Sequence, residues 1–205
     1  MMTDKVDFRK ILKNLYNPTK GSFHLVEVPR MNFLMMDGVG DPNIVPEYQL
    51  AIEALYSLAY GIKFASKSEG MDYVVPPLEG LWWMENMNEF TLANKYRWEW
   101  TMLIMQPEWV SAEMVDKVRQ DVLKKKRNLS ISKVRFEPYH EGLCVQILYI
   151  GAYKDEASTI AEMHKYIMGN GYQTNGKHHE IYLGDVRKTS PEKLQTILRQ
   201  PIRKV

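Results

Sequence analysis

Two halves of this chain carry the same order of predicted elements. Each half begins with a strand, a glycine-containing turn and a helix, and each ends with two strands, LEGLWW and TMLIMQ in the first half and HEIYL and TILRQ in the second. Glu79 and Glu180 occupy matching positions in the third element. One strand–helix–strand–strand module cannot bury its apolar faces alone. The sequence therefore predicts an α+β fold of two duplicated modules around a pseudo-twofold axis, with an antiparallel sheet and a ligand cleft at the axis.

The repeat also sets the predicted domain organisation. An N-terminal helical extension at residues 1–20 precedes one domain at residues 21–205, which consists of module one at about 22–107, a linking helix at about 108–127 and module two at about 133–205. The extension contains a helix over residues 4–16, because apolar residues recur there at helical spacing until Asn17 and Pro18. We expect this helix to pack outside the main fold.

Periodicity and turn residues define the remaining predicted elements. A strand with a bulge or an edge position is expected over residues 23–36, because Pro29 cannot donate to a ladder. The other predicted strands are 78–84, 96–105, 142–150, 178–183 and 196–205, and the predicted helices begin near Pro46, Glu108, Asp155 and Ser190.

Composition narrows the class of protein. The 205 residues are 45% hydrophobic and 25% charged, which is the balance of a folded globular chain. A net charge of +2 gives no support for direct nucleic-acid binding. The single cysteine, Cys144, cannot form an internal disulfide and favours a reducing, cytoplasmic compartment, and we expect no membrane partner because long uncharged apolar runs are absent. Five Trp, twelve Tyr and thirteen Met suit an adaptable hydrophobic pocket.

Strand alternation brings a carboxylate and aromatic rings onto one face. Glu79 and Trp83 share a face of their strand while Trp82 points the other way, and Glu180 and Tyr182 point together. A carboxylate among rings needs a cation, a hydrogen-bond donor or a proton. The residues that we expect to line the cleft are Glu180, Glu79, Trp82, Trp83, Tyr182, Tyr149 and Trp100.

Other site classes lack support in the sequence. His178 and His179 are adjacent on a strand and so point to opposite faces, and no further Cys or His set is spaced to complete a metal site. Cys144 lies in an apolar run and reads as a buried residue, not a nucleophile. No phosphate-binding glycine loop has the right context, so we expect neither a metal nor a cofactor.

Several long segments resemble the GyrI-like small-molecule-binding family. They are YVVPPLEGLWW at 73–83, EGLCVQILYIGAYKDE at 141–156, GKHHEIYLGD at 176–185 and the tail TSPEKLQTILRQPIRK. The resemblance implies the duplicated module with its axial cleft. It also implies that Glu180 matches a glutamate with which related regulators sense lipophilic cations. The chain departs from the family pattern at Tyr149, Ala152 and Lys154, where the family usually has His, Pro and Asp.

Three functions follow from this resemblance. The first is binding of lipophilic, aromatic, often cationic small molecules, without a direct nucleic-acid contact because about twenty residues before the first strand cannot hold a helix-turn-helix domain. The second is hydrolysis, since stand-alone relatives open the cyclopropane ring of DNA-alkylating natural products. Glu180 would be the general base, and a tyrosine, Tyr149 or Tyr182, or a tryptophan would be the hydrogen-bond donor to the oxyanion. The third is a gyrase-inhibitor-like protein contact, which rests on the family name alone.

Overall fold

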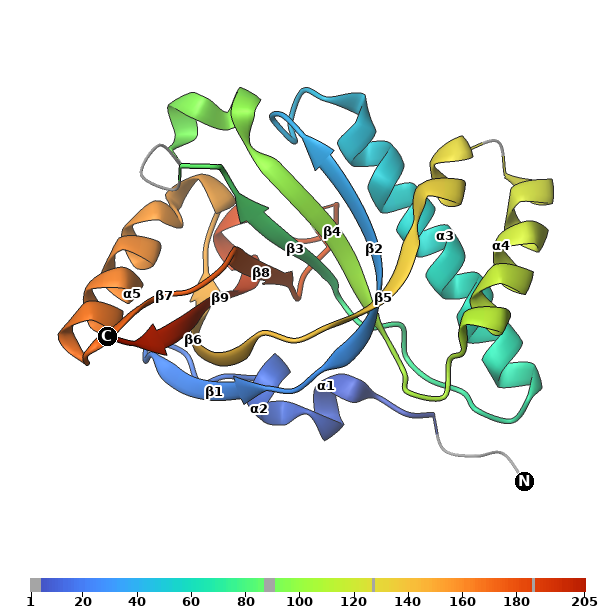
Figure 1. Ribbon diagram of the computed structural model, residues 1–205, viewed down its shortest axis with the longest axis horizontal. Coiled ribbons are helices and arrows are strands. Elements are labelled where there is room, and N and C mark those ends of the chain that lie inside the picture. Colours follow the sequence, from blue (N-terminus) through green and yellow to red (C-terminus); the bar gives the residue numbers. More distant parts are fainter. Residues whose placement is uncertain (1–4, 87–90, 127, 186) are drawn as a thin grey trace. The chain divides into compact units, whose positions relative to one another are not determined.

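The computed structural model describes residues 5–86, 91–126, 128–185 and 187–205, which form two compact units (Figure 1). Unit 1 comprises Met1–Phe8, Met31–Pro76 and Trp82–Tyr139. Unit 2 comprises Arg9–Arg30, Pro77–Leu81 and His140–Val205. Helices and antiparallel strand pairs occur in both units, so the α+β class with antiparallel pairing is confirmed.

Unit 1 is a helix-covered antiparallel sheet. Its elements are β2 (Met31–Val39), α3 (Pro46–Ser68), the end of β3 (Leu78–Trp83), β4 (Glu99–Gln106), α4 (Ala112–Lys125) and β5 (Arg135–Tyr139). Strand β2 pairs with both β4 and β5. Helix α3 begins at a proline, which suits the first helical position, and packs on β2, β4 and α4. Its buried stripe of Ala51, Leu55, Leu58 and Ile62 has the three- and four-residue spacing of an apolar helix face.

A glycine in β2 makes room for the largest buried side chain of unit 1. Trp100 is fully buried, and a Cβ at Gly38 would lie 2.1 Å from its indole ring. The two residues are direct partners in the β2–β4 register. Only glycine therefore fits at position 38 while Trp100 keeps its place.

Unit 2 also consists of helices and antiparallel strands. Its elements are α1 (Phe8–Ile11, from Arg9 on), α2 (Lys13–Tyr16), β1 (His24–Val28), the start of β3, β6 (Gly142–Ile150), α5 (Ala157–Gly169), β7 (Tyr172–Thr174), β8 (His178–Tyr182) and β9 (Gln195–Lys204). The order of the strands is β1-β6-β9-β8, and β7 pairs with the C-terminal end of β9. Helix α5 packs on this sheet through Met163 and Ile167, which join Val145, Ile147 and Leu198 in one apolar cluster.

Two predicted elements differ in the structure, and two observed strands were not predicted. The predicted strand over 23–36 is two strands, β1 and β2, which end and begin on either side of Pro29 and Arg30 and lie in different units. The helix predicted from Glu108 begins at Ala112, because the Ser111 hydroxyl accepts the Met114 N–H at 3.2 Å and caps it there. Strands β5 and β7 were not predicted.

The N-terminal segment does not pack outside the fold as expected. Instead of one helix over 4–16 it forms the two short helices α1 and α2. Leu15 and Tyr16 at the end of α2 are each only 1% exposed. The end of the segment therefore belongs to the core of unit 2.

The element order agrees with the predicted repeat. Strand β2, α3, β3 and β4 follow one another in the first half, and β6, α5, β8 and β9 do so in the second, with β7 inserted. The duplication itself and its pseudo-twofold axis stay a prediction.

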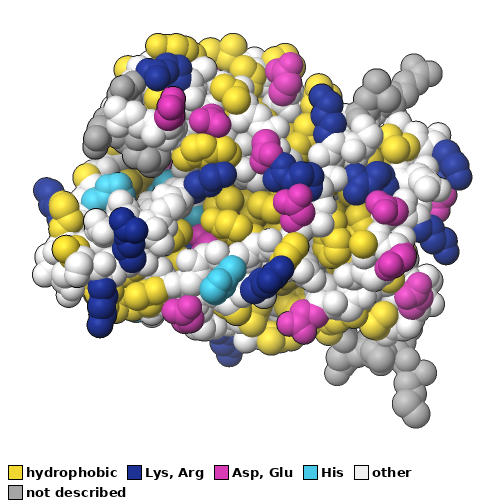
Figure 2. All heavy atoms as spheres, in the orientation of Figure 1, with side chains coloured by type: hydrophobic (Ala, Val, Ile, Leu, Met, Phe, Trp, Pro, Cys, Tyr) yellow, Lys and Arg dark blue, Asp and Glu magenta, His cyan; other side chains and the backbone are white. Residues whose placement is uncertain are grey.

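The distribution of charged side chains on the surface agrees with the low net charge of the sequence, and the character of the helices agrees with its lack of long apolar runs. Basic and acidic side chains are interspersed over the face that Figure 2 shows. Across the described ranges, no helix has both the length and the apolar character needed to cross a membrane.

Candidate functional site

The register of unit 2 places three predicted site residues on one face of its sheet. Thr196 of β9 is the partner of Tyr149 on β6 and of Tyr182 on β8, while Leu198 is the partner of Glu180. Directly paired residues of antiparallel strands share a face. Tyr149, Thr196 and Tyr182 therefore form one row, and Glu180 lies in the next row on the same face.

Helix α5 covers this face and brings a carboxyl group to it. The inward residues of the helix are Ile160, Met163 and Ile167, which pack on the sheet. Glu156, directly before the helix, lies four residues ahead of Ile160 and so falls on the same stripe. Its side chain is consequently directed toward the sheet, at the end where Thr196 and Tyr182 lie.

Glu180 is oriented by its neighbours on β8. The Tyr182 hydroxyl donates a hydrogen bond to Glu180 Oε2 at 2.8 Å, and His178 Nε2 lies 3.5 Å from Oε1. The Glu180 side chain is 16% exposed, so solvent still reaches it. A fixed, partly accessible carboxylate can accept a proton from water or pair with a cation.

Glu156 is the second carboxyl group of this face, and it is buried. The residue is 4% exposed, and in the part of unit 2 that the structure describes neither its Oε1 nor the nearby Thr196 hydroxyl has a hydrogen-bond partner of good geometry. Burial first, and then the negative charge of Glu180, raise the pKa of Glu156 to about 9. Glu156 is therefore protonated at neutral pH.

Tyr149 lies on this face, but its hydroxyl is engaged in the following turn. It donates to the carbonyl oxygen of Ala152 at 3.0 Å. Burial and then the charges of Glu156 and Asp155 raise its pKa. Gly151, with φ 157°, runs under the ring so closely that a Cβ there would lie 2.4 Å from the hydroxyl. The Tyr149 hydroxyl therefore donates its hydrogen bond within the turn and is not free to donate to a ligand.

The predicted tryptophans lie in unit 1 and differ in exposure. Trp82 is 4% exposed and packs against Tyr48 and Trp98, with ring centroids 6.0 and 5.9 Å away. Trp100 is fully buried and meets Tyr48 edge to face at 5.2 Å. Trp83 is half-buried. Of the two neighbouring tryptophans, Trp82 is therefore the packing residue and Trp83 the one with accessible ring surface.

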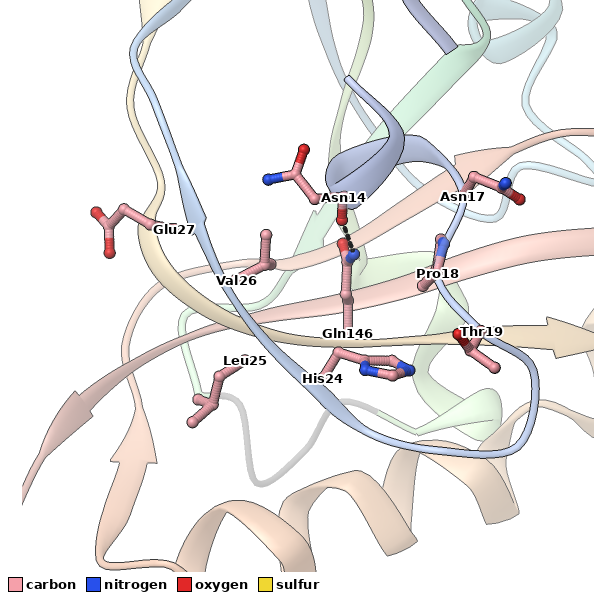
Figure 3. A pocket seen from close by; sticks show the side chains of 9 residues that line it. All are labelled: Asn14, Asn17, Pro18, Thr19, His24, Leu25, Val26, Glu27 and Gln146. Carbon is pink, nitrogen blue, oxygen red and sulfur yellow. Dashed lines mark hydrogen bonds between the residues drawn. The ribbon is translucent and has the colours of Figure 1, made fainter. Parts of the chain in front are cut away.

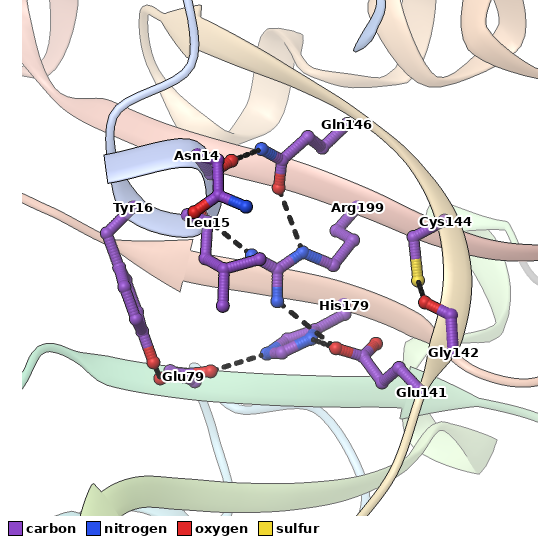
Figure 4. A network of polar contacts seen from close by, with 10 residues as sticks. All are labelled: Asn14, Leu15, Tyr16, Glu79, Glu141, Gly142, Cys144, Gln146, His179 and Arg199. Carbon is purple, nitrogen blue, oxygen red and sulfur yellow. Dashed lines mark hydrogen bonds and ion pairs between the residues drawn. The ribbon is translucent and has the colours of Figure 1, made fainter. Parts of the chain in front are cut away.

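Glu79 lies in a different place from Glu180, inside a buried polar network (Figure 4). Tyr16 donates to Glu79 Oε1 at 2.9 Å, and His179 Nε2 lies 3.0 Å from Glu79 Oε2. His179 Nδ1 is 3.0 Å from Glu141 Oε2, which also accepts from Arg199 at 3.1 Å. His179 and Glu180 are adjacent on β8, so the network and Glu180 are on opposite faces. The structure does not bring the two predicted glutamates together.

The network balances its charges internally. Burial alone would lower the pKa of His179, but the carboxylates of Glu141 and Glu79 raise it to about 9. Burial likewise would raise the pKa of Glu141, but His179 and Arg199 lower it to about 2. Two carboxylates thus meet two cations at neutral pH, which is the arrangement that makes buried charges tolerable. We therefore interpret the network as structural, because the side chains at its centre are all buried.

Backbone carbonyl groups of the N-terminal segment also take part in this network. The Leu15 carbonyl oxygen accepts from Arg199 at 2.7 Å, and the Asn14 carbonyl oxygen accepts from Gln146 at 2.7 Å. Gln146 in turn accepts from Arg199 at 3.0 Å. Segment 14–16 therefore supplies hydrogen-bond acceptors that a buried guanidinium needs.

A separate hollow of about 380 Å³ lies in unit 2 beside the N-terminal segment and β1 (Figure 3). Its lining residues are Asn14, Asn17, Pro18, Thr19, His24, Leu25, Val26, Glu27 and Gln146. Glu180 is not among them. Within the described chain, no group of three His, Cys, Asp or Glu side chains is placed to hold a metal ion.

The most informative residues that the sequence reading missed are Glu156, Glu141 and Arg199. Glu156 follows the helix stripe, so its inward direction was readable from the spacing to Ile160. Glu141 and Arg199 carried no such signal, because both are charged residues whose burial depends on partners distant in sequence.

Comparison with known proteins shows which family the chain matches. The model of a family described as a GyrI-like small molecule binding domain matches residues 22–203. A structure of a conserved protein from Listeria innocua is 42% identical, with a TM-score of 0.90, and the match covers 97% of this chain and 100% of that one. A hydrolase from Listeria innocua is 41% identical, with a TM-score of 0.88 and coverage of 98% and 100%.

More distant structures share the fold alone. The C-terminal domain of EcmrR has a TM-score of 0.59 at 11% identity, over 90% of this chain and 98% of that domain. No curated protein matches the chain.

Proposed function

The chain belongs to the GyrI-like family of small-molecule binding domains, and on this premise we propose that it is a hydrolase in which Glu180 activates water against a lipophilic small molecule. One observation carries the proposal. Glu180 is an oriented, partly accessible carboxylate, held by the Tyr182 hydroxyl and next to a buried second carboxyl group. The 41% identity to a hydrolase over nearly the whole chain supports the same conclusion.

The proposed chemistry is general-base addition of water. Glu180 accepts a proton from water as the water oxygen bonds to an electrophilic carbon. For the substrate class that the family resemblance implies, this carbon belongs to a cyclopropane ring, and the ring C–C bond breaks. The electron pair of that bond moves to a conjugated carbonyl oxygen, which then takes up a proton, so the net change is addition of one water molecule.

The contacts support different roles for the two predicted tyrosines. Tyr182 donates a hydrogen bond to Glu180 and so positions the base, instead of donating to the substrate. Tyr149 donates to Ala152 and shapes the wall of the site. We propose both of these roles together with the role of Glu180.

A second candidate is capture of a cationic aromatic ligand without turnover. Tyr153 and Tyr182 meet edge to face with ring centroids 5.6 Å apart, and Tyr182 also contacts Glu180. Rings beside a carboxylate form a favourable environment for a lipophilic cation. In this case Glu180 neutralises the ligand instead of activating water.

One experiment separates the two candidates. The purified chain and its E180Q variant are incubated with a cyclopropane-bearing DNA-alkylating compound, and the ring-opened product is measured by mass spectrometry. Hydrolysis predicts turnover by the wild type and at least about a hundredfold slower turnover by E180Q, with binding of the neutral compound retained. Binding without product by the wild type would leave capture as the function. Equal turnover by both proteins would refute the role of Glu180.

The matched control for this experiment is E162Q. Glu162 lies on the exposed side of α5 in the same unit, so the substitution removes the same charge away from the covered face. Turnover by E162Q should equal that of the wild type.

A further inference from the structure

Two carboxyl groups from different elements are directed to the covered face of unit 2, and the charge of Glu180 acts on Glu156 there. Glu180 comes from β8 and Glu156 from the segment that leads into α5. The other titratable groups directed to this face are Tyr149 on β6, His178 and Tyr182 on β8 and His164 on α5. Among the described residues, no Lys or Arg forms an ion pair with either carboxyl group.

The surroundings of Glu156 do not support a second negative charge. Burial without a cation strongly disfavours an ionised carboxylate. The N-terminus of α5 favours an anion, but by less than the effect of a single pKa unit. The Thr196 hydroxyl lowers the pKa of Glu156, but by less than burial and the charge of Glu180 raise it, and Glu156 Oε1 has no hydrogen-bond partner among the described residues. Protonation of Glu156 removes the cost.

We propose that Glu156 and Glu180 act as one acid–carboxylate pair that carries a single proton at neutral pH, so that the site selects neutral or singly charged ligands. The inference rests on the proposed function for the position of the ligand. It adds a second functional residue, Glu156, and a ligand charge class. Titratable groups whose surroundings separate their pKa values divide the acid and base roles in this way.

The pair has a defined response to pH. As the pH rises through the pKa of Glu156, which is about 9, loss of the Glu156 proton adds one negative charge to the pair. A lipophilic monocation should therefore bind more tightly as the pH rises through this value. Coupling by one pKa unit corresponds to a roughly tenfold change in affinity.

The first test needs no ligand. Carboxyl carbons of glutamate are labelled with ¹³C, and their NMR shifts are followed from pH 4 to pH 10 in the wild type, E156Q and the control E162Q. The pair predicts a resonance that is still protonated at pH 7, present in the wild type and E162Q and absent in E156Q. If every glutamate is ionised at pH 7, the pair does not exist.

The second test measures ligand selection. Affinity for the aromatic monocation tetraphenylphosphonium is determined at pH 7 and pH 10 by fluorescence titration. The wild type and E162Q should gain about tenfold in affinity with pH, whereas E156Q should bind at both values with little change. An equal pH response in E156Q and wild type overturns the inference. No binding by any of the proteins, with the protonated resonance present, overturns the proposed ligand site and leaves the carboxyl pair standing.

A stability measurement guards against a misfolded variant. Glutamine has the shape and neutral charge of a protonated glutamate, so E156Q should have the thermal midpoint of the wild type at pH 7. A large loss of stability at pH 7 would show that the wild type needs an ionised Glu156 and would contradict the pair.

Discussion

His179 and Glu180 are consecutive residues of β8, and their side chains take part in two separate polar systems. His179 is fully buried between the carboxylates of Glu79 and Glu141. Glu180 lies on the other face with the Tyr182 hydroxyl 2.8 Å away. One strand therefore carries a structural cation on one face and the proposed base on the other, and the two can be tested independently.

Replacing Tyr182 by phenylalanine should slow the proposed hydrolysis. A hydrogen bond to a charged group contributes about 1.5–3 kcal/mol, and here it also fixes the direction of the carboxylate. We expect Y182F to lower kcat/KM by about tenfold or more while it folds as the wild type does. Steady-state kinetics on the cyclopropane-bearing compound, with Y172F as the control on β7, would show the effect. Unchanged kinetics would mean that Tyr182 does not position Glu180.

Replacing His179 should destabilise the fold. Removal of one partner from a buried ion pair leaves an uncompensated charge and costs about 3–5 kcal/mol. We expect H179Q to lose this much free energy of unfolding in urea titrations at pH 7. His140 is exposed in the same unit, so H140Q should change the free energy by less than about 0.5 kcal/mol. A small effect of H179Q would show that the network tolerates an unpaired carboxylate.

The fold should also weaken at alkaline pH through the same residue. The pKa of His179 is about 9 in the folded chain against an ordinary value of 6.5, so the folded state binds this proton more tightly. The stabilisation is complete below pH 6.5 and is lost as the pH rises through about 9. The free energy of unfolding of the wild type should fall by about 3 kcal/mol between these values.

The variant H179Q provides the control for this pH dependence. It has no titrating group at position 179, so its stability should vary less with pH over the same interval. A wild-type curve that stays flat from pH 6.5 to pH 10 would mean that His179 is not protonated in the folded chain.

Cys144 should resist thiol reagents until the chain unfolds. The residue is fully buried, and burial, followed by the charge of Glu141, raises the pKa of its thiol far above the ordinary value. Thiolate, the reactive form, is therefore scarce as well as inaccessible. An Ellman assay should detect no fast thiol in the native protein and one thiol in denaturant. Fast labelling of the native protein would require local opening of β6.

Parts of the fold that depend on local pattern were predictable from the sequence. Helix α3 was expected from Pro46 and its stripe through Ile62, and β6, β8 and β9 were expected from short apolar runs. The shared direction of Glu180 and Tyr182 followed from strand alternation and is confirmed by their hydrogen bond. Local spacing was enough in each case because the evidence lies within a few residues.

Other features depended on contacts between distant segments. Whether Glu79 faces a ligand or a buried histidine is decided by Tyr16 and His179, which lie 63 and 100 residues away in the chain. The same holds for the division of the predicted strand at Pro29, since the two resulting strands pair with β6 and with β4 and β5. No periodicity encodes such pairing.

The carbonyl groups of Asn14 and Leu15 carry a consequence for where the folding unit begins. The region that matches the family starts at residue 22, yet the acceptors that satisfy Gln146 and Arg199 come from residues 14 and 15. A chain trimmed to the matched region would leave a guanidinium in the interior with an acceptor missing and a glutamate without its phenol donor. The region that matches the family therefore begins later in the chain than the region that the fold needs to satisfy its buried polar groups.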